Sequence, residues 1–430
     1  MAQIHKQFSD DEVKQYLTWY ETGVMDKTAV LRALGVKDSR FYALLAQFRD
    51  KPKEFSVTYK RIRPTHSLPS AVVKEIRREL ETEHGFITNP AMPILFYNYA
   101  AIRDAVEEQT GHALSAQTVV NYAKKWGFYT ERPKKAGHTR EVLTDSVGML
   151  LQHDASLHQW SPYALRPDGK PEKWSLITTL DDHSRMLLYA GLFAHESAWA
   201  HIQALESVVL THGVGIQYYS DNHAIFRYVA NRDRNGTSAA TYQRILRTDD
   251  TAPQWKQCVE ASGMKVTYAL SPEAKGKIER PYRWLQDRIV RRAAREHART
   301  IEQVRDLLAQ EVDRYNNRQV HGTTREIPAK RFLTAVNDGR TCFRPLDMTK
   351  TKPPVTSTRD IFCLRTERQV NGYGKISLAN NQLSVPGHLP DGTTVQLHLL
   401  PGAQLTEVRF LRNDAVLGYQ RIPTPSSLQF

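Results

Sequence analysis

The sequence predicts an α/β protein in which a central mixed sheet follows N-terminal helical segments and precedes a small C-terminal β-domain. Three observations predict this order. Apolar residues recur at helical spacing up to about residue 129, strand and helix patterns alternate between residues 149 and 220, and short strands broken by turn residues fill the chain after residue 360. Alternating strands and helices typically form a sheet covered by helices.

The composition favours a polyanionic partner. The 430 residues are enough for about two to four domains. Lys and Arg number 59 against 46 acidic residues, a net charge of +13, although a basic protein without such a partner is the alternative reading. Cys258, Cys342 and Cys363 form no CxxC pair, so neither a disulfide framework nor a zinc ribbon is indicated. No signal-sequence core or long apolar run appears, and we expect a cytoplasmic protein without a membrane span.

The first helical unit, residues 1–55, has the pattern of a helix-turn-helix domain. Helices are predicted over residues 10–21, 27–34 and 38–48. Gly35 relieves the turn between the second and the third, so that Lys37, Ser39 and Arg40 would face a DNA groove. The alternative is an ordinary three-helix bundle, because such bundles use similar spacing.

A second helix-turn-helix unit is predicted over residues 65–130. Its helices cover residues 69–83, residues 97–110, and a last segment that Ser115 caps and Gly127 ends. The candidate contacts with base edges or phosphates are Gln117, Thr118, Asn121, Lys124 and Lys125. A solvated helix face is an equally good reading of the short polar residues. The segment 131–145 that follows reads as a basic linker, in which Lys134 and Lys135 would track a phosphate backbone.

The central segment places acidic residues where predicted strands end. An apolar strand pattern ends in Asp154, a hairpin follows over residues 174–190, and a helix is predicted over residues 197–211. A further strand, residues 215–220, leads directly to Asp221. The polar residues 231–263 read as an insertion. The strand pattern then resumes over residues 264–270, just before a helix that Ser271 can cap and that contains Glu279.

Asp154, Asp221 and Glu279 could converge on one edge of such a sheet. Their oxygen-only donors favour Mg²⁺ or Mn²⁺, and two such ions about 3.5–4 Å apart can clamp the attacking and leaving oxygens of a phosphoryl displacement. Other side chains have structural readings that compete with catalysis. These are Glu273 at the helix start, Asp181 and Asp182 in a turn, and the histidines His153 and His223. No GxxxxGK[ST] loop appears, so an intrinsic ATPase is not indicated.

Four motifs in this order resemble the catalytic core of DDE-type bacterial insertion-sequence transposases and retroviral-type integrases. They are Gln152-His153-Asp154, Thr179-Leu180-Asp181-Asp182-His183-Ser184-Arg185, Tyr219-Ser220-Asp221-Asn222 and Ala274-Lys275-Gly276-Lys277-Ile278-Glu279-Arg280. The resemblance covers residues 154–332 and implies an RNase H-like fold with the acidic triad on Asp154, Asp221 and Glu279. It also implies two Mg²⁺ ions that serve to cleave element ends and to join the resulting 3′-hydroxyls to target DNA.

Two features depart from that family pattern. The interval between Asp221 and Glu279 is longer than usual, which the insertion explains. Pro281 follows Glu279 closely, and inside a helix it would remove one hydrogen bond and bend the axis. Beside the triad, the cations Lys275, Lys277, Arg280 and Arg283 would attract a phosphate backbone, with a solvated basic face as the alternative.

The remaining chain is divided by its breaker residues. The catalytic domain is predicted over residues 146–340, a linker over residues 341–359, and a small β-barrel over residues 360–430. Together these expectations predict a transposase or integrase that acts on double-stranded DNA as a homo-multimer near the bacterial nucleoid. A helper protein is left open. A non-catalytic DNA-binding regulator and a metal-dependent nuclease without strand transfer are the alternatives.

Overall fold

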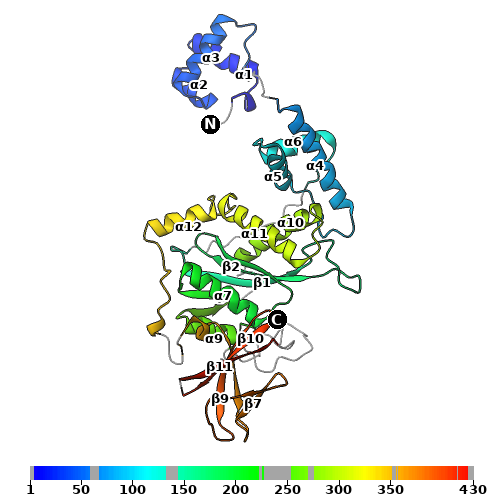
Figure 1. Cartoon of the computed structure of the whole chain (residues 1–430). Helices are drawn as coiled ribbons and strands as arrows, with labels where there is room; N and C mark the ends of the chain where they lie inside the picture. Colours follow the sequence, from blue (N-terminus) through cyan, green and yellow to red (C-terminus); the bar gives the residue numbers. More distant parts are fainter. Residues whose placement is uncertain are drawn as a thin grey trace, which may run out of the picture. The chain divides into compact units, whose positions relative to one another are not determined.

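The computed structural model describes residues 4–58, 67–131, 144–221, 225–226, 253–269, 276–350, 355, 357–413 and 415–424. The chain forms two compact units, Met1–Val73 and Lys74–Phe430, each of which is described by itself (Figure 1). None of the helices in the described ranges combines the length and the apolar character that crossing a bilayer requires. The predicted positions of Glu273, His223, Lys134, Lys135, Lys275 and the Ser271 cap lie outside these ranges.

The first unit is a three-helix arrangement around an apolar core. It contains the 3-10 turn η1 (Ile4–Lys6) and the helices α1 (Asp10–Glu21), α2 (Lys27–Leu34) and α3 (Asp38–Asp50). Ser9 caps α1 with a capping box, and Gly35 ends α2 with a φ of +62°, a conformation that glycine adopts without strain. The predicted helices are confirmed. Their assignment to a helix-turn-helix domain stays a prediction.

Three further helices follow, of which α4 begins within the first unit and lies mostly in the second. They are α4 (Ser70–Thr88), α5 (Tyr99–Thr110) and α6 (Ala116–Trp126). The Ser115 hydroxyl accepts a hydrogen bond from the backbone N–H of Thr118, and Gly127 ends α6 in the left-handed conformation. Both signals were expected from the sequence.

The central sheet has five strands in the order β3-β2-β1-β4-β5. The strands are β1 (Leu150–His158), β2 (Trp174–Asp181), β3 (Leu187–Phe193), β4 (Gln217–Ser220) and β5 (Lys265–Tyr268). β1, β2 and β3 pair antiparallel, whereas β4 runs parallel to both β1 and β5. The predicted mixed α/β sheet is confirmed.

Helices cover both faces of the sheet (Figure 1). On one face lie α10 (Gly276–Arg295) and α11 (Ile301–Asn317), with α12 (Pro328–Asn337) following in the chain. On the other lie α7 (Ala198–His212) and α9 (Gln254–Ala261). Leu176 and Leu180 of β2 pack with Leu285 of α10, while Ile177 between them packs with Ala204 of α7. The strand alternation therefore assigns each side chain to one helical layer.

Two expectations for the central region were wrong. β1 does not end at Asp154 but continues to His158, because residues 154–158 keep pairing with β2 as far as Trp174. The expected insertion up to residue 263 contains a core helix, α9, whose Trp255, Cys258 and Val259 are buried. Four apolar residues in eight gave too short a pattern to predict it.

The C-terminal region is not a closed barrel in its described part. It consists of a four-stranded antiparallel sheet in the order β11-β10-β9-β6 and a separate β7-β8 hairpin. The strands are β6 (Leu364–Gln369), β7 (Lys375–Leu378), β8 (Asn381–Ser384), β9 (Thr394–Pro401), β10 (Leu405–Arg412) and β11 (Ala415–Pro423), preceded by η3 (Met348–Lys350) and α13 (Thr358–Ile361). The Gln254 side chain donates to the backbone carbonyl of Arg365, so the sheet is attached to α9.

Candidate active site

Asp154 and Asp221 belong to neighbouring parallel strands of the sheet. The register of β1 and β4 ends with the pair Gln152 and Tyr219; Asp154 comes two residues later within β1, and Asp221 directly follows Ser220, the last residue of β4. Asp154 pairs with Thr178, whose side chain meets Tyr282 of α10, so Asp154 lies on the face that α10 covers. Both residues are half-buried. Two of the three predicted carboxylates therefore come from neighbouring strands.

Glu279 lies in the first described turn of α10 and is exposed. Its neighbour Ile278 and the residue one turn later, Tyr282, point into the core between α10 and the sheet. The helix continues through Pro281, so Glu279 is a helical residue rather than a cap residue. Glu279 is thus on the helix that faces the aspartates, on its exposed flank.

The α10 residue Tyr282 is hydrogen-bonded to the strand that carries Asp154. Its hydroxyl donates to the backbone carbonyl of Asp154 at 2.5 Å and accepts from the hydroxyl of Thr178 at 2.9 Å. Burial, together with the negative charges of Asp154 and Glu196, raises the pKa of Tyr282 well above its ordinary value. The phenol therefore stays protonated and keeps its donor role.

Lys277, which lies two residues before Glu279 on α10, is bound to a buried carboxylate. Its ammonium lies 2.9 and 2.8 Å from the two carboxylate oxygens of Asp182, whose side chain is fully buried. Asp182 also accepts hydrogen bonds from Gln152, Arg185 and Thr144. Burial lowers the pKa of Lys277, and the Asp182 carboxylate counteracts that effect. Asp182, in the turn after β2, thus binds the start of α10 to the sheet.

The turn between β2 and β3 is itself fixed by buried polar contacts. Asp181 accepts hydrogen bonds from the N–H of Gly148 and from the N–H and hydroxyl of Ser184. Arg185 has a φ of +67°, a strained backbone for a residue with a side chain, and its guanidinium donates to Asp182 at 3.0 Å. The predicted structural roles of Asp181 and Asp182 agree with these contacts.

His153 belongs to the opposite layer of the molecule. It precedes Asp154 on β1, so its side chain points to the α7 face, where it is fully buried. One ring nitrogen pairs with the hydroxyl of Thr179 at 2.9 Å and the other with His201 at 2.8 Å, and the ring stacks on Trp255. These contacts favour the structural reading of this histidine.

The donor atoms suit a hard cation, but the full triad is not assembled. Carboxylate oxygens are what Mg²⁺ and Mn²⁺ prefer, and Asp154 and Asp221 would supply them from neighbouring strands. Across the part of the chain that the structure describes, no three His, Cys, Asp or Glu side chains form a group that could hold a metal ion. Asp154, Asp221 and Glu279 are thus suitable in chemistry but are not gathered into such a group.

The candidate DNA-binding side chains are mostly on the surface. On α3 and just before it, Lys37, Ser39 and Arg40 are exposed. On α6, Gln117, Asn121, Lys124 and Lys125 are exposed and Thr118 is half-buried. The Gln117 amide donates to Asn121 at 3.0 Å, one turn away, so these two polar groups satisfy each other. On α10, Arg280 and Arg283 are exposed, and the Arg280 guanidinium donates to Thr323.

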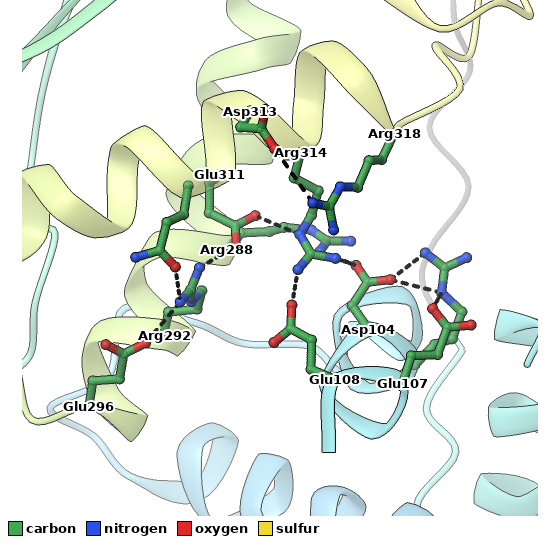
Figure 2. Close-up of polar contacts among 12 residues, drawn as sticks. Asp104, Glu107, Glu108, Arg288, Arg292, Glu296, Glu311, Asp313, Arg314 and Arg318 are labelled. Carbon is green, nitrogen blue, oxygen red and sulfur yellow. Dashed lines mark hydrogen bonds and ion pairs between the residues drawn. The ribbon is translucent and has the colours of Figure 1, made fainter. Parts of the chain in front are cut away.

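Sequence reasoning missed a set of arginines that fasten α4 and α5 to α10 and α11. Arg288 and Arg314 both reach Asp104 of α5, and Arg314 also pairs with Glu108 (Figure 2). Arg291, 1% exposed, pairs with the fully buried Glu83 of α4. The spacing of Arg288, Arg291, Arg292 and Arg295 on one side of α10 was the available signal.

The sequence analysis also did not predict the contacts of Tyr282, Thr178 and Arg185. A sequence does not show which partner a buried hydroxyl or guanidinium will meet.

The chain is 25% identical over 281 residues to "Putative transposase y4bF" of Sinorhizobium fredii, a match that covers 65% of this chain and 53% of that protein. It is 27% identical over 188 residues to the transposase for insertion sequence IS1202 of Streptococcus pneumoniae, covering 44% of this chain and 36% of that protein. The chain thus matches about half, or less, of the length of these curated relatives. No family model matches.

Two solved structures show weak likenesses. The HTLV-2 integrase catalytic core domain in complex with magnesium is 12% identical, with 44% of this chain and 98% of that chain covered and a TM-score of 0.29. A chain in the simian T-cell lymphotropic virus intasome with PP2A regulatory subunit B56 gamma is 12% identical, with 75% and 92% covered and a TM-score of 0.32. With TM-scores this low, nothing about the fold or function of this chain is concluded from these two structures. At the level of sequence, the predicted resemblance to insertion-sequence transposases is confirmed by the similarity to two transposases.

Proposed function

We propose that this chain is a DNA transposase that binds the terminal repeats of its element, cleaves them and joins the 3′-hydroxyls to target DNA. The observation that supports the proposal is the parallel pairing of β1, which carries Asp154, with β4, which leads to Asp221, in a sheet covered by the helix of Glu279. The similarity to two transposases supports the same class of reaction.

Asp154, Asp221 and Glu279 would hold two Mg²⁺ or Mn²⁺ ions. When bound, such ions lower the pKa of the attacking water or hydroxyl and offset the charge that develops on the phosphate and the leaving oxygen. Asp154 would offer its oxygens from β1, and Asp221 from the residue that follows β4. The exposed Glu279 side chain would have to turn toward them while α10 keeps its place, because the triad is not gathered in the described residues. Arg280 and Arg283 are exposed on the same helix and would contact the DNA backbone.

The two helical modules would recognise the terminal repeats. Lys37, Ser39 and Arg40 at the start of α3 and Lys124 and Lys125 on α6 are exposed cations and polar groups on short helices, which suits contacts with phosphates and base edges. Joining two ends requires two active sites, so the proposal includes a homo-multimer on DNA. It also includes a cytoplasmic location at the nucleoid, and leaves a helper protein open.

A non-catalytic DNA-binding regulator is the second candidate. The observation that favours it is that the three carboxylates do not form a metal-holding group among the described residues. A regulator would keep the DNA-binding modules and would need none of the three acids.

A joining assay separates these functions. The full chain is incubated with a linear duplex that ends in the DNA flanking its gene and is labelled at the 5′ end of the strand to be transferred, with a supercoiled plasmid, and with MgCl₂ or EDTA. We expect label to enter the plasmid only with MgCl₂, and Asp154→Asn to abolish cleavage and joining while retaining duplex binding in a gel shift. Asp168→Asn, which changes an exposed loop carboxylate, is the matched control and should behave as the unaltered chain.

Three results would count against the proposal. Duplex binding without any Asp154-dependent cleavage identifies a regulator. Cleavage without joining identifies a nuclease. Equal activity of Asp154→Asn and the unaltered chain means that the acidic site plays no part.

A further inference from the structure

Glu279 lies between two attachments of α10 to the central sheet. Two residues before it, Lys277 is bound to the buried Asp182. Three residues after it, Tyr282 is hydrogen-bonded to the Asp154 carbonyl and to Thr178. Residues three apart on a helix lie on neighbouring turns, so the Tyr282 contact fixes the turn next to the one that carries Glu279.

The Tyr282 contact links the helix that carries Glu279 directly to the backbone of Asp154. Its hydroxyl binds the backbone of Asp154 itself, and Thr178 is the β2 residue paired with Asp154 across the ladder. Tyr282 is 6% exposed and Thr178 is fully buried, so water does not replace either partner readily. A shift of α10 along or away from the sheet must break these hydrogen bonds.

We propose that Tyr282 is a positioning residue, whose hydroxyl, held between Thr178 and the Asp154 carbonyl, sets the distance between the helix of Glu279 and the strand of Asp154. This inference rests on the proposed function, because it assigns a purpose to the spacing of the two acids. Outer hydrogen bonds that orient metal ligands typically change metal affinity by about 10- to 100-fold when removed.

The chain offers a matched control for a buried phenol. Tyr315 of α11 belongs to the same apolar cluster as Tyr282 and is 4% exposed. Its hydroxyl is buried without a hydrogen-bond partner in the described residues. Tyr282→Phe and Tyr315→Phe therefore remove the same atom from the same layer, and only the first removes a link to Asp154. Neither variant alters the charge near the acids.

The experiment measures Mn²⁺ binding to the full chain without DNA. MnCl₂ is titrated into the unaltered chain, Tyr282→Phe, Thr178→Val, Tyr315→Phe and Asp154→Asn, and free Mn²⁺ is read from its electron paramagnetic resonance signal. Melting in EDTA checks that each variant is folded. We expect Tyr282→Phe to weaken Mn²⁺ binding about tenfold, Thr178→Val to weaken it less, and Tyr315→Phe to leave it unchanged. In the joining assay the MgCl₂ requirement should rise in the same order, with duplex binding unchanged.

The outcomes distinguish this inference from the proposed function. If Asp154→Asn abolishes Mn²⁺ binding but Tyr282→Phe binds as tightly as Tyr315→Phe, the positioning role is wrong and the acidic site stands. If Asp154→Asn binds Mn²⁺ as the unaltered chain does, the proposed site fails and the role of Tyr282 fails with it. If Tyr282→Phe does not fold, Thr178→Val decides, since it removes the other partner of the same hydroxyl.

Discussion

The two helical modules that precede the sheet are stabilised in different ways. The α1–α3 module buries only apolar side chains in its core, among them Val13, Leu17, Val30, Phe41 and Leu44. Its ion pairs, such as Arg49 with Glu21, lie on the surface. Surface pairs contribute little, so the apolar core supplies most of the stability of this module.

The α4–α6 module also buries apolar side chains, and it is in addition fastened to α10 and α11 by buried ion pairs. Arg291 pairs with Glu83, and Arg288 with Asp104, with all four side chains almost without solvent contact. Burial alone would lower the pKa of Arg291, yet the Glu83 and Asp287 carboxylates raise it above its ordinary value. From this contrast we expect α1–α3 to fold by itself and α4–α6 to depend on the helix that also carries Glu279.

The largest effect is expected from breaking the most buried ion pair. Arg291→Met leaves the Glu83 carboxylate buried without its main cation, which should cost about 3–5 kcal/mol of unfolding free energy in the second unit. Hydrogen exchange of α4 and α10 should increase, while α1–α3 is unaffected. The control is Arg291→Met with Glu83→Leu, which removes both charges and should recover most of the loss. A single variant that costs under about 1 kcal/mol would contradict the contrast between the modules.

A core truncation should act on the other module alone. Leu44 of α3 is fully buried, and Leu44→Ala should cost about 3 kcal/mol through lost apolar burial and the cavity left behind. We expect hydrogen exchange in α1, α2 and α3 to rise together, because they share one core, with α4–α6 unchanged. Leu31→Ala, at a partly buried position of α2, should cost clearly less. Accelerated exchange in α4–α6 after Leu44→Ala would show that the two modules are not independent.

Acid should weaken the second unit before the first. Burial, aided by Arg185, Arg280 and Arg331, lowers the pKa of His321 to about 4. Above pH 6.5 neither state binds a proton there. Between pH 6.5 and 4 the unfolded chain binds one and the folded chain does not, so stability falls by about 2 kcal/mol, allowing for solvent screening. Urea unfolding over this range measures the slope, and His321→Asn should flatten it in the second unit. An unchanged slope would exclude His321 as its source.

The sequence predicted most of the helices and strands, but it did not predict how differently the α1–α3 and α4–α6 modules are stabilised. Helical spacing and capping residues predicted α1–α6, and strand patterns predicted the mixed sheet, in which Asp154 lies on β1 and Asp221 follows β4. Those signals are local. The length of β1 was wrong because Ser156 and His158, although polar, go on pairing with β2.

The partners of the cations could not be predicted, because they are set by contacts far apart in the chain. Lys277 was expected to face DNA, and its ammonium binds Asp182, which lies 95 residues away. Arg291 meets Glu83 across 208 residues. A sequence shows that a helix is basic but does not show which of its charges are already neutralised. The same limit applies to Glu279, whose approach to the aspartates depends on how α10 is held.

The smallest expected effect compares one substitution in both modules. Ser9 and Ser115 each accept a hydrogen bond from a backbone N–H at a helix start, and replacing such a cap by Ala costs about 1 kcal/mol. In α1–α3 we expect Ser9→Ala to raise hydrogen exchange across all three helices, since the module unfolds as one. In α4–α6 we expect Ser115→Ala to raise exchange in α6 only, because α4 and α5 stay fastened to α10. Ser9→Asp and Ser115→Asp preserve the cap and should preserve exchange. If Ser115→Ala accelerates exchange in α4 and α5 as much as in α6, then the ion pairs to α10 do not hold those helices independently, and the difference between the modules disappears.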